Sequence, residues 1–453
     1  MKIGVVSLGC PKNLVDSETM LGLIHEENYE ITNDPSEAEI IIVNTCGFIE
    51  SAKEESINTI LQMAEYKKSG SCKYIIVTGC LSQRYAEELF SELPEADVIA
   101  GVEVYDEIGS IIKRVMNGER FIMLERSKPD VIYTSKETFL PRILTTPSYT
   151  AYLKIAEGCD NCCSYCAIPK IRGPYRSKPM EQVLKEAKAL ADNGVKELIV
   201  VAQDTTRYGE DLPGGKLLLA DLLKELNKIE SLKWIRVMYC YPNNFTDELI
   251  ETFASLDKVC KYVDLPLQHA SNRLLASMNR YDTREEVETL LAKLRKRIPG
   301  IVIRTTFIVG FPGETDADFE ELKEFVEQQR FENAGVFAYS QEEGTVAGAM
   351  PNQIPDEIKQ ERYHELMALQ AQISEEIHKD TEGQTLEVLV EGIEEDGSGL
   401  HYGRSYREAP DIDGLVFIEN PGDIKPGCFV KVNILQRICR RKNINSRGKD
   451  HES

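Results

Sequence analysis

The stretch 158–166, GCDNCCSYC, carries three cysteines at the spacing C-x3-C-x2-C, which are Cys159, Cys163 and Cys166. It directly follows an apolar, strand-like run, TAYLKIAE at 150–157. Three thiolates on one short loop suit three corners of an iron–sulfur cube, and the fourth iron then stays open to a substrate or cofactor. The spacing therefore predicts an open iron–sulfur cluster at the end of a strand.

A zinc site is the alternative for the same loop. Structural zinc takes four protein ligands, usually as two separated cysteine pairs. Cys162 is the remaining thiol on the loop, but it neighbours Cys163, and adjacent side chains rarely point at one metal. Because the triplet is one ligand short for zinc, we favour the cluster.

Charge and cysteine usage narrow the class of protein. The 453 residues are enough for about two to four domains. The 75 acidic and 53 basic residues give a net charge of −22, which repels phosphate backbones and disfavours a nucleic acid as substrate. The chain shows no leader-like start and no apolar run that could span a bilayer, and its twelve cysteines follow a metal-like pattern. These features predict a cytoplasmic enzyme that does not enter a membrane.

Residues 1–125 alternate short apolar runs with helical segments, as in an open parallel α/β sheet. Three of the runs, KIGVVSLGC, EIIIVNTC and YIIVTGC, end in a cysteine, at Cys10, Cys46 and Cys80. Ligand sites form beyond the carboxyl ends of parallel strands, so these thiols should converge. A single such cysteine is usually an ordinary buried thiol. Three at one structural position predict a second cluster with three protein ligands.

A helix start is expected after each of these cysteines. The expected starts are Asp16-Ser17-Glu18, Ser51 and Ser82, all of residue types that favour helix N-termini. A helix N-terminus carries partial positive charge, which favours thiolates. This arrangement suits metal ligation.

Residues 148–380 predict a partial (βα)6 barrel that follows a proline-containing linker at 126–147. Six strand-like runs alternate with amphipathic segments, which implies parallel strands and right-handed crossovers. Catalytic groups then belong at the carboxyl ends of the strands, where the cysteine loop also lies. A long helix from Asp356 to about Asp380 closes this part. Polar residues follow several of the runs, among them Gln203, Asp204, Tyr239 and Gln268.

Residues 381–440 change to short alternating runs separated by Gly and Pro, which predicts a small antiparallel β-barrel. From Asp380 to Gln436 there are 12 acidic and 4 basic residues. An acidic module of this kind suits a basic protein better than RNA. The last residues, 441–453, are predicted to form a basic tail.

The chain resembles the radical S-adenosylmethionine methylthiotransferases over nearly its whole length. This family combines the cysteine triplet after the first barrel strand with an N-terminal cysteine trio and a terminal TRAM domain. One group in it modifies tRNA adenosine, and the RimO-type group modifies an aspartate of small-subunit ribosomal protein twelve. The sequences SLGCPKNLVDSE, AQDTTRYG, LPLQHAS, TTFIVGFPGET and GRSYREAPDIDG look like the RimO-type group. The tRNA enzymes, which are the alternative, typically show Gln-Met-Asn where this chain has Pro11-Lys12-Asn13.

The resemblance implies two [4Fe–4S] clusters and S-adenosylmethionine as cofactors. The radical-generating cluster would bind Cys159, Cys163 and Cys166, and the auxiliary cluster would bind Cys10, Cys46 and Cys80. Contacts to S-adenosylmethionine are implied for Tyr165, Gln203, Asp204, Arg304, Gly310 and Gly313. The competing roles are loop packing for Tyr165, helix capping for Gln203 and Asp204, a structural ion pair for Arg304 and a simple turn for the glycines.

The resemblance also implies the reaction, which is methylthiolation at the β-carbon of an aspartate. One S-adenosylmethionine would supply the methyl group and a second the 5′-deoxyadenosyl radical. An external electron donor and a sulfur donor would be partners besides the basic ribosomal protein. Cys162 departs from the family pattern. The remaining cysteines are interpreted as ordinary thiols, namely Cys72, Cys240, Cys260, Cys428 and Cys439.

Overall fold

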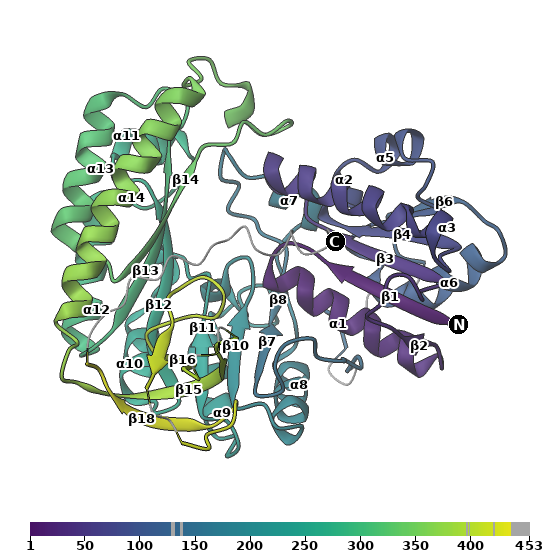
Figure 1. Cartoon of the computed structure of the whole chain (residues 1–453). Coiled ribbons are helices and arrows are strands. Elements are labelled where there is room, and N and C mark those ends of the chain that lie inside the picture. The colour runs from purple at the N-terminus through teal and green to yellow at the C-terminus, as the bar shows by residue number, and fades with distance from the viewer. Residues whose placement is uncertain (128–131, 136–138, 396, 398, 420–421, 436–453) are drawn as a thin grey trace.

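The computed structural model describes residues 1–127, 132–135, 139–395, 397, 399–419 and 422–435. Two six-stranded sheets and one four-stranded sheet organise this part of the chain (Figure 1). Both six-stranded sheets are parallel and the C-terminal sheet is antiparallel, which confirms the predicted fold class. Among the described helices, none is both long enough and apolar enough to cross a membrane.

The N-terminal sheet has the strand order β2-β1-β3-β4-β5-β6. Its central strands are rich in Ile and Val because helices cover both faces, as parallel sheets require. The strands are β1 (Lys2–Ser7), β2 (Glu30–Ile31), β3 (Ile40–Thr45), β4 (Tyr74–Gly79), β5 (Val98–Ala100) and β6 (Phe121–Met123). The helices are α1 (Pro11–Glu26), α2 (Glu50–Ala64), α3 (Tyr66–Ser69), α4 (Cys80–Arg84), α5 (Ala86–Glu92), α6 (Ile108–Met116) and the 3₁₀ turn η1 (Tyr105–Glu107).

Two of the predicted helix starts in this domain are wrong. Helix α1 begins at Pro11, directly after Cys10, and not at Asp16. Proline suits the first helical position because its fixed φ matches the helix and its missing N–H is not needed there. Helix α4 begins at Cys80 itself, and α2 begins at Glu50, one residue before Ser51. The helix N-termini therefore stand closer to the cysteines than the sequence indicated.

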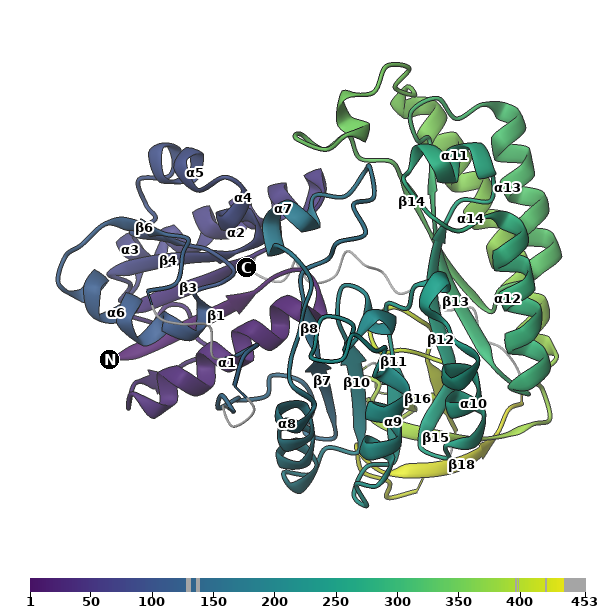
Figure 2. The same ribbon diagram turned by 180° about the vertical axis from the view of Figure 1, so that it is seen from behind.

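The central sheet has the order β14-β13-β12-β11-β10-β7, so neighbours in the sheet are neighbours in the sequence. Helices cover its outer face (Figure 2) and supply the largest apolar core. The strands are β7 (Thr150–Lys154), β10 (Glu197–Val201), β11 (Trp234–Val237), β12 (Val259–Gln268), β13 (Val302–Val309) and β14 (Asn333–Ala338). The helices are α7 (Ile168–Arg172), α8 (Met180–Asp192), α9 (Leu219–Asn227), α10 (Asp247–Ser255), α11 (Asn272–Ser277), α12 (Arg284–Arg297), α13 (Asp316–Gln329) and α14 (Asp356–Lys379), with the 3₁₀ turns η2 (Thr205–Arg207), η3 (Pro242–Asn244) and η4 (Ala347–Ala349).

The run 150–157 is not one strand, as the sequence suggested, but two. Strand β7 ends at Lys154, and Ala156–Glu157 form β8, which pairs antiparallel with β9 (Arg176–Ser177). This small ribbon joins the two ends of the segment that holds the cysteine triplet. The two ends of the cysteine-containing segment are therefore fixed side by side where it leaves the barrel.

The C-terminal sheet consists of β15 (Thr385–Ile393), β16 (His401–Ser405), β17 (Val416–Ile418) and β18 (Phe429–Asn433), in the order β17-β16-β15-β18. It lies across the inner face of the central sheet, on the side away from helices α8 to α10 (Figures 1 and 2). Arg404 reaches from β16 to Glu197 on β10, with Nη2 2.6 Å from Oε2. Arg236 on β11 pairs with the same carboxylate at 3.0 Å. The predicted tail at 441–453 and Cys439 lie outside the described residues.

Replacing Arg404 with alanine is expected to lower the free energy of unfolding by about 1–3 kcal/mol, the range for leaving a buried polar group with fewer partners. Burial opposes ionisation of Glu197, but Arg404 and Arg236 lower its pKa to about 2. Arg236 remains in the variant, so the carboxylate stays partly paired. Denaturant unfolding measures the change.

Lys233→Ala is the matched control because Lys233 joins the same two sheets, with Nζ 3.2 Å from Oε1 of Glu387. Unlike Arg404, the Lys233 side chain is half exposed. An exposed ion pair contributes about 0–1 kcal/mol. Equal losses of unfolding free energy in the two variants would show that the buried cluster of Glu197, Arg236 and Arg404 does not hold the C-terminal sheet in place.

Candidate active site

Hydrogen bonds to several backbone groups hold the cysteine loop in place. The N–H of Cys159 donates to the carbonyl oxygen of Gly173 at 3.2 Å, and that of Ser164 donates to Met278 at 2.9 Å. Asn279 donates from its side chain to the carbonyl oxygen of Cys162 at 2.9 Å. Cys162 has a φ of 50° and an exposed side chain, whereas the three predicted ligands are partly buried. The left-handed turn thus sets Cys162 apart from the triplet.

The surroundings of Cys159 and Cys166 do not stabilise thiolates by themselves. Burial raises the pKa of Cys159 to about 11. Burial and the neighbouring Cys163 raise the pKa of Cys166 to about 12. Thiolates in such surroundings require a nearby positive charge, which bound iron supplies. The donor set and its surroundings therefore fit a metal cluster.

The three loops that carry the N-terminal cysteines touch one another. A Cβ atom at Gly9 would lie 2.8 Å from the Cβ of Cys46, and one at Gly47 would lie 3.0 Å from the carbonyl carbon of Cys80. Burial raises the pKa of Cys46 to about 11, and the charges of Cys80 and Cys10 add to this rise. The structure thus brings together the three cysteines that follow β1, β3 and β4.

Cys10 differs from the other two thiols of the N-terminal trio. Burial opposes its ionisation, but the cations Lys12 and Arg172 together with the N–H groups of Asn13 and Lys12 lower its pKa. Cys10 also stands at the N-terminus of α1, where the helix favours negative charge. The trio therefore contains one thiol that is predisposed to be a thiolate.

No three His, Cys, Asp or Glu side chains of the described residues are grouped closely enough to hold one metal ion. The thiolates of a cubane cluster bind different irons, so they stand farther apart than the ligands of a single ion. Assignment of both trios to clusters stays a prediction.

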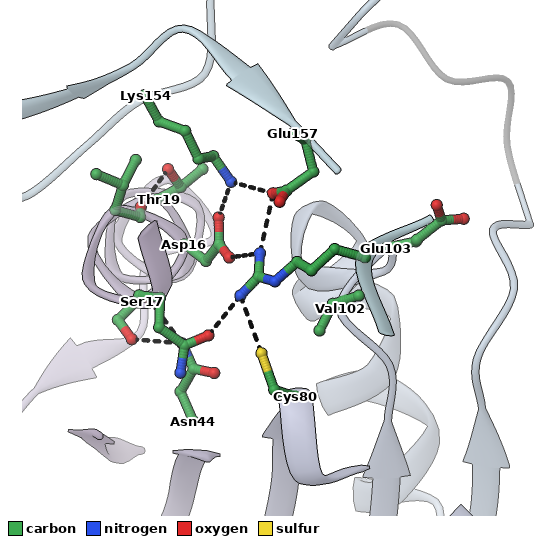
Figure 3. A network of polar contacts seen from close by, with 12 residues as sticks. Asp16, Ser17, Thr19, Asn44, Cys80, Val102, Glu103, Lys154 and Glu157 are labelled. Atoms are coloured by element: carbon green, nitrogen blue, oxygen red, sulfur yellow. Dashed lines mark hydrogen bonds and ion pairs between the residues drawn. The ribbon is translucent and has the colours of Figure 1, made fainter. Parts of the chain in front are cut away.

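A buried network of charges joins the N-terminal domain to the barrel (Figure 3). The Arg172 guanidinium on α7 donates to Asp16 at 2.8 Å and to Glu157 at 2.9 Å. Lys154 bonds the same two carboxylates, at 2.8 Å for Glu157. Arg172 also donates to the sulfur of Cys80 at 3.5 Å. Two cations therefore balance two carboxylates beside one of the predicted cluster ligands, in side chains that are at most 6% exposed.

This network places the two cysteine trios next to each other. Asp16 and Cys80 belong to the N-terminal domain, and Arg172 lies six residues after Cys166. Cys80 also packs in one apolar cluster with Ala167, the residue that follows Cys166. The only sequence signal of this network is the pair of charges in the buried strand run 150–157, because a charge in such a run requires a partner.

Gln203 is one of the predicted cofactor contacts, and one of its buried side-chain atoms is an acceptor without a partner among the described residues. Its Nε2 donates to Glu157 at 2.6 Å. Its Oε1 is buried and has no hydrogen-bond partner among the described residues. Buried polar atoms are rarely left unpaired, so Oε1 suits a donor such as an amino group. Asp204 instead holds the cysteine loop by accepting from Asn161 at 3.0 Å.

The other predicted contacts have structural partners. Arg304 pairs with Asp264 at 2.9 Å and with Asp413 of the C-terminal region at 3.4 Å. Tyr165 packs against the apolar cluster around Phe311. Gly310 and Gly313 have φ values of 73° and 79°, and a Cβ at Gly310 would collide with Lys359. These contacts match the alternative roles of these residues, and their cofactor roles stay predictions.

Two residues at strand ends have backbone conformations that are uncommon outside glycine. Tyr239, just beyond β11, has a φ of 60°, and Gln268, at the end of β12, has a φ of 74°. Strained residues of this kind cluster at functional sites. The Tyr239 ring faces the N-terminal domain, where Lys12 Nζ lies 3.5 Å from the ring centroid. Lys12 is a further site residue that the sequence analysis did not single out.

Known proteins resemble the chain over almost all of its length. A protein from Desulforamulus reducens is 54% identical over 95% of this chain and 96% of its own length. One from Pelotomaculum thermopropionicum is 52% identical over 96% of each. Both are named ribosomal protein uS12 methylthiotransferase RimO. The chain belongs to the RimO family. The predicted relationship is therefore confirmed.

Three broader families match successive parts of this RimO family member. They are the uncharacterized protein family UPF0004 at 2–101, the radical SAM superfamily at 153–326 and the TRAM domain at 383–437. The radical S-adenosylmethionine methyltransferase TsrM from Kitasatospora setae shares the fold with a TM-score of 0.54 at 14% identity, over 74% of this chain and 72% of that one. As a radical SAM enzyme of the RimO family, the chain uses S-adenosylmethionine and an iron–sulfur cluster.

Proposed function

We propose that this methylthiotransferase adds a methylthio group to the β-carbon of an aspartate in ribosomal protein uS12. The observation that carries the proposal is the 54% identity to a uS12 methylthiotransferase over 95% of the chain. Two further features support the proposal. The two cysteine trios lie next to each other at the mouth of the barrel, and a TRAM domain follows the barrel in the chain.

The chain's own residues hold and aim the reacting groups. When bound, S-adenosylmethionine and the clusters supply the radical and the methylthio group. Cys159, Cys163 and Cys166 would hold the radical-generating cluster, and Gln203 Oε1 would accept a hydrogen bond from the amino group of S-adenosylmethionine. A fixed geometry of this kind is the main contribution a protein makes to radical chemistry.

The second cluster would bind Cys10, Cys46 and Cys80. Arg172 supports this assignment because a guanidinium that donates to the Cys80 sulfur favours the thiolate. An external electron donor and a sulfur donor complete the set of partners. Since the substrate is a ribosomal protein, the reaction would take place in the cytoplasm.

The intact mass of uS12 after anaerobic reaction with the reconstituted enzyme tests the proposal. The expected gain is one methylthio group in place of one hydrogen, with no gain for Cys159→Ala. A gain of a methyl mass without sulfur would show a methylation-only enzyme. Unchanged uS12 together with methylthiolated tRNA would establish the alternative substrate.

We expect the affinity for uS12 to fall as salt is raised. Basic ribosomal proteins are attracted by negative charge, and the TRAM region exposes five described carboxylates, at Glu382, Glu395, Asp411, Glu419 and Asp423. Attraction between exposed charges is screened beyond about 10 Å at 0.1 M salt. Binding measured between about 0.05 and 0.5 M salt checks this. A constant affinity over that range would exclude recognition by surface charge.

A further inference from the structure

Lys12 brings a positive charge to the boundary between the two cysteine-bearing domains. It is the second residue of α1 and lies two positions after Cys10. Its side chain crosses to the barrel, where Nζ sits 3.5 Å from the centre of the Tyr239 ring. The residue is only 9% exposed. A cation in this position is removed from bulk water and lies at the carboxyl end of β11.

No carboxylate of the described residues forms an ion pair with Lys12. Arg172 and Lys154 together balance Asp16 and Glu157. No carboxylate of the described residues lies within 4.0 Å of Lys12 Nζ, whereas the neighbouring cations each contact two. A buried ammonium group is costly unless it is paired and hydrogen-bonded. Lys12 therefore acts on the neighbouring Cys10 thiol but has no carboxylate partner among the described residues.

The face of the Tyr239 ring contacts the Lys12 ammonium group, and the backbone of Tyr239 is itself fixed by hydrogen bonds. Its N–H donates to Asp264 Oδ2 at 3.0 Å, and its carbonyl oxygen accepts from the N–H of Thr205 at 3.0 Å. Asp264 is in turn bound by Arg304 at 2.9 Å. An aromatic face attracts a cation but leaves its N–H groups free to bind an anion. The arrangement keeps Lys12 oriented without neutralising it.

We infer that Lys12 binds the side-chain carboxylate of the substrate aspartate. The inference rests on the proposed function and names the residue that selects an acidic side chain. A carboxylate at Lys12 Nζ would give the ammonium group an anionic hydrogen-bond partner and would place the adjacent β-carbon at the boundary between the two cysteine-bearing domains. An uncharged amide at the same place would offer its oxygen as an acceptor but no negative charge, so it would bind the ammonium group more weakly. Lys12 is thus a specificity residue that discriminates aspartate from asparagine.

The test compares uS12 with a variant in which the modified aspartate, located by mass mapping, is replaced by asparagine. Dissociation constants are measured with the reconstituted enzyme. The unmodified enzyme is expected to bind the aspartate form about 30-fold more tightly or better, the lower end for a buried charge pair that loses one partner. In Lys12→Met the ratio of the two dissociation constants, asparagine form to aspartate form, should fall to about one. In Lys12→Arg, which keeps the charge, most of the ratio should remain.

Two further measurements separate this role from a structural one. Iron per chain and cleavage of S-adenosylmethionine without uS12 are measured in Lys12→Met and Lys12→Arg, and the dissociation constants are compared at matched iron content, because Lys12 also acts on the predicted cluster ligand Cys10. Lys73→Met is the matched control, because Lys73 precedes β4 at the opposite edge of the sheet and pairs with Glu39 on the surface; it should keep the full ratio.

The outcomes distinguish the inference from the function it rests on. If the unmodified enzyme leaves uS12 unmodified, the proposed function fails. If uS12 is methylthiolated but Lys12→Met retains the aspartate preference, Lys12 does not bind the carboxylate. Loss of iron in Lys12→Met with the preference intact would assign Lys12 to the N-terminal cluster and overturn the inference in the same way.

Discussion

Replacing Arg172 with methionine is expected to lower the free energy of unfolding by about 3–5 kcal/mol, because one partner of a buried charge network is removed. Arg172 and Lys154 balance Asp16 and Glu157 inside the protein. Without the guanidinium, one negative charge remains buried and uncompensated. Methionine preserves much of the side-chain volume, so loss of charge dominates the change. Denaturant unfolding of the variant and the unmodified protein measures it.

A second substitution tests whether charge is the cause. Arg172→Met combined with Asp16→Asn removes one charge of each sign and should recover part of the lost stability, as coupled neighbours do in double-mutant cycles. Arg297→Met is the control, because Arg297 pairs with the exposed carboxylates of Asp247 and Glu251 at the surface and its loss should cost only about 0–1 kcal/mol. Additive losses in the double variant would contradict the charge-balance explanation.

The two cysteine trios were predictable because their signals are local. Spacing within 158–166 identifies the first trio, and the position of Cys10, Cys46 and Cys80 after apolar runs identifies the second. The carboxyl ends of parallel strands meet at one edge of a sheet, so strand patterns alone bring these residues together. The strand order of the central sheet follows the sequence because consecutive βα units place successive strands side by side.

The surroundings of the trios depend on tertiary contacts and were not predictable. The network around Arg172 joins residues that are up to 159 positions apart, and no local pattern pairs them. No sequence pattern indicates that Asp413 of the C-terminal region pairs with Arg304, and the cofactor role of Arg304 stays a prediction. The first helix start was misplaced because Cys10 and Pro11, rather than Asp16-Ser17-Glu18, form the N-terminus of α1. The unusual φ of Tyr239 has no sequence signature.

Replacing Cys46 with alanine is expected to abolish methylthiolation while leaving S-adenosylmethionine cleavage intact. Cys46 is one of three ligands proposed for the auxiliary cluster, whereas the loop 159–166 is anchored by other elements. With two clusters of equal size, iron per chain should fall to about half. The measurements are iron content, 5′-deoxyadenosine release and the intact mass of uS12.

Cys72→Ala and Cys159→Ala complete the experiment. Cys72 is a buried thiol of the same domain that packs in its apolar core, so its loss should change neither iron content nor product. Like Cys46→Ala, Cys159→Ala should lose about half of the iron. Unlike Cys46→Ala, it should no longer cleave S-adenosylmethionine. Because product then disappears in both cluster variants for different reasons, only cleavage separates them. Unchanged iron in Cys46→Ala would show that the N-terminal trio holds no cluster, whatever the product assay reports.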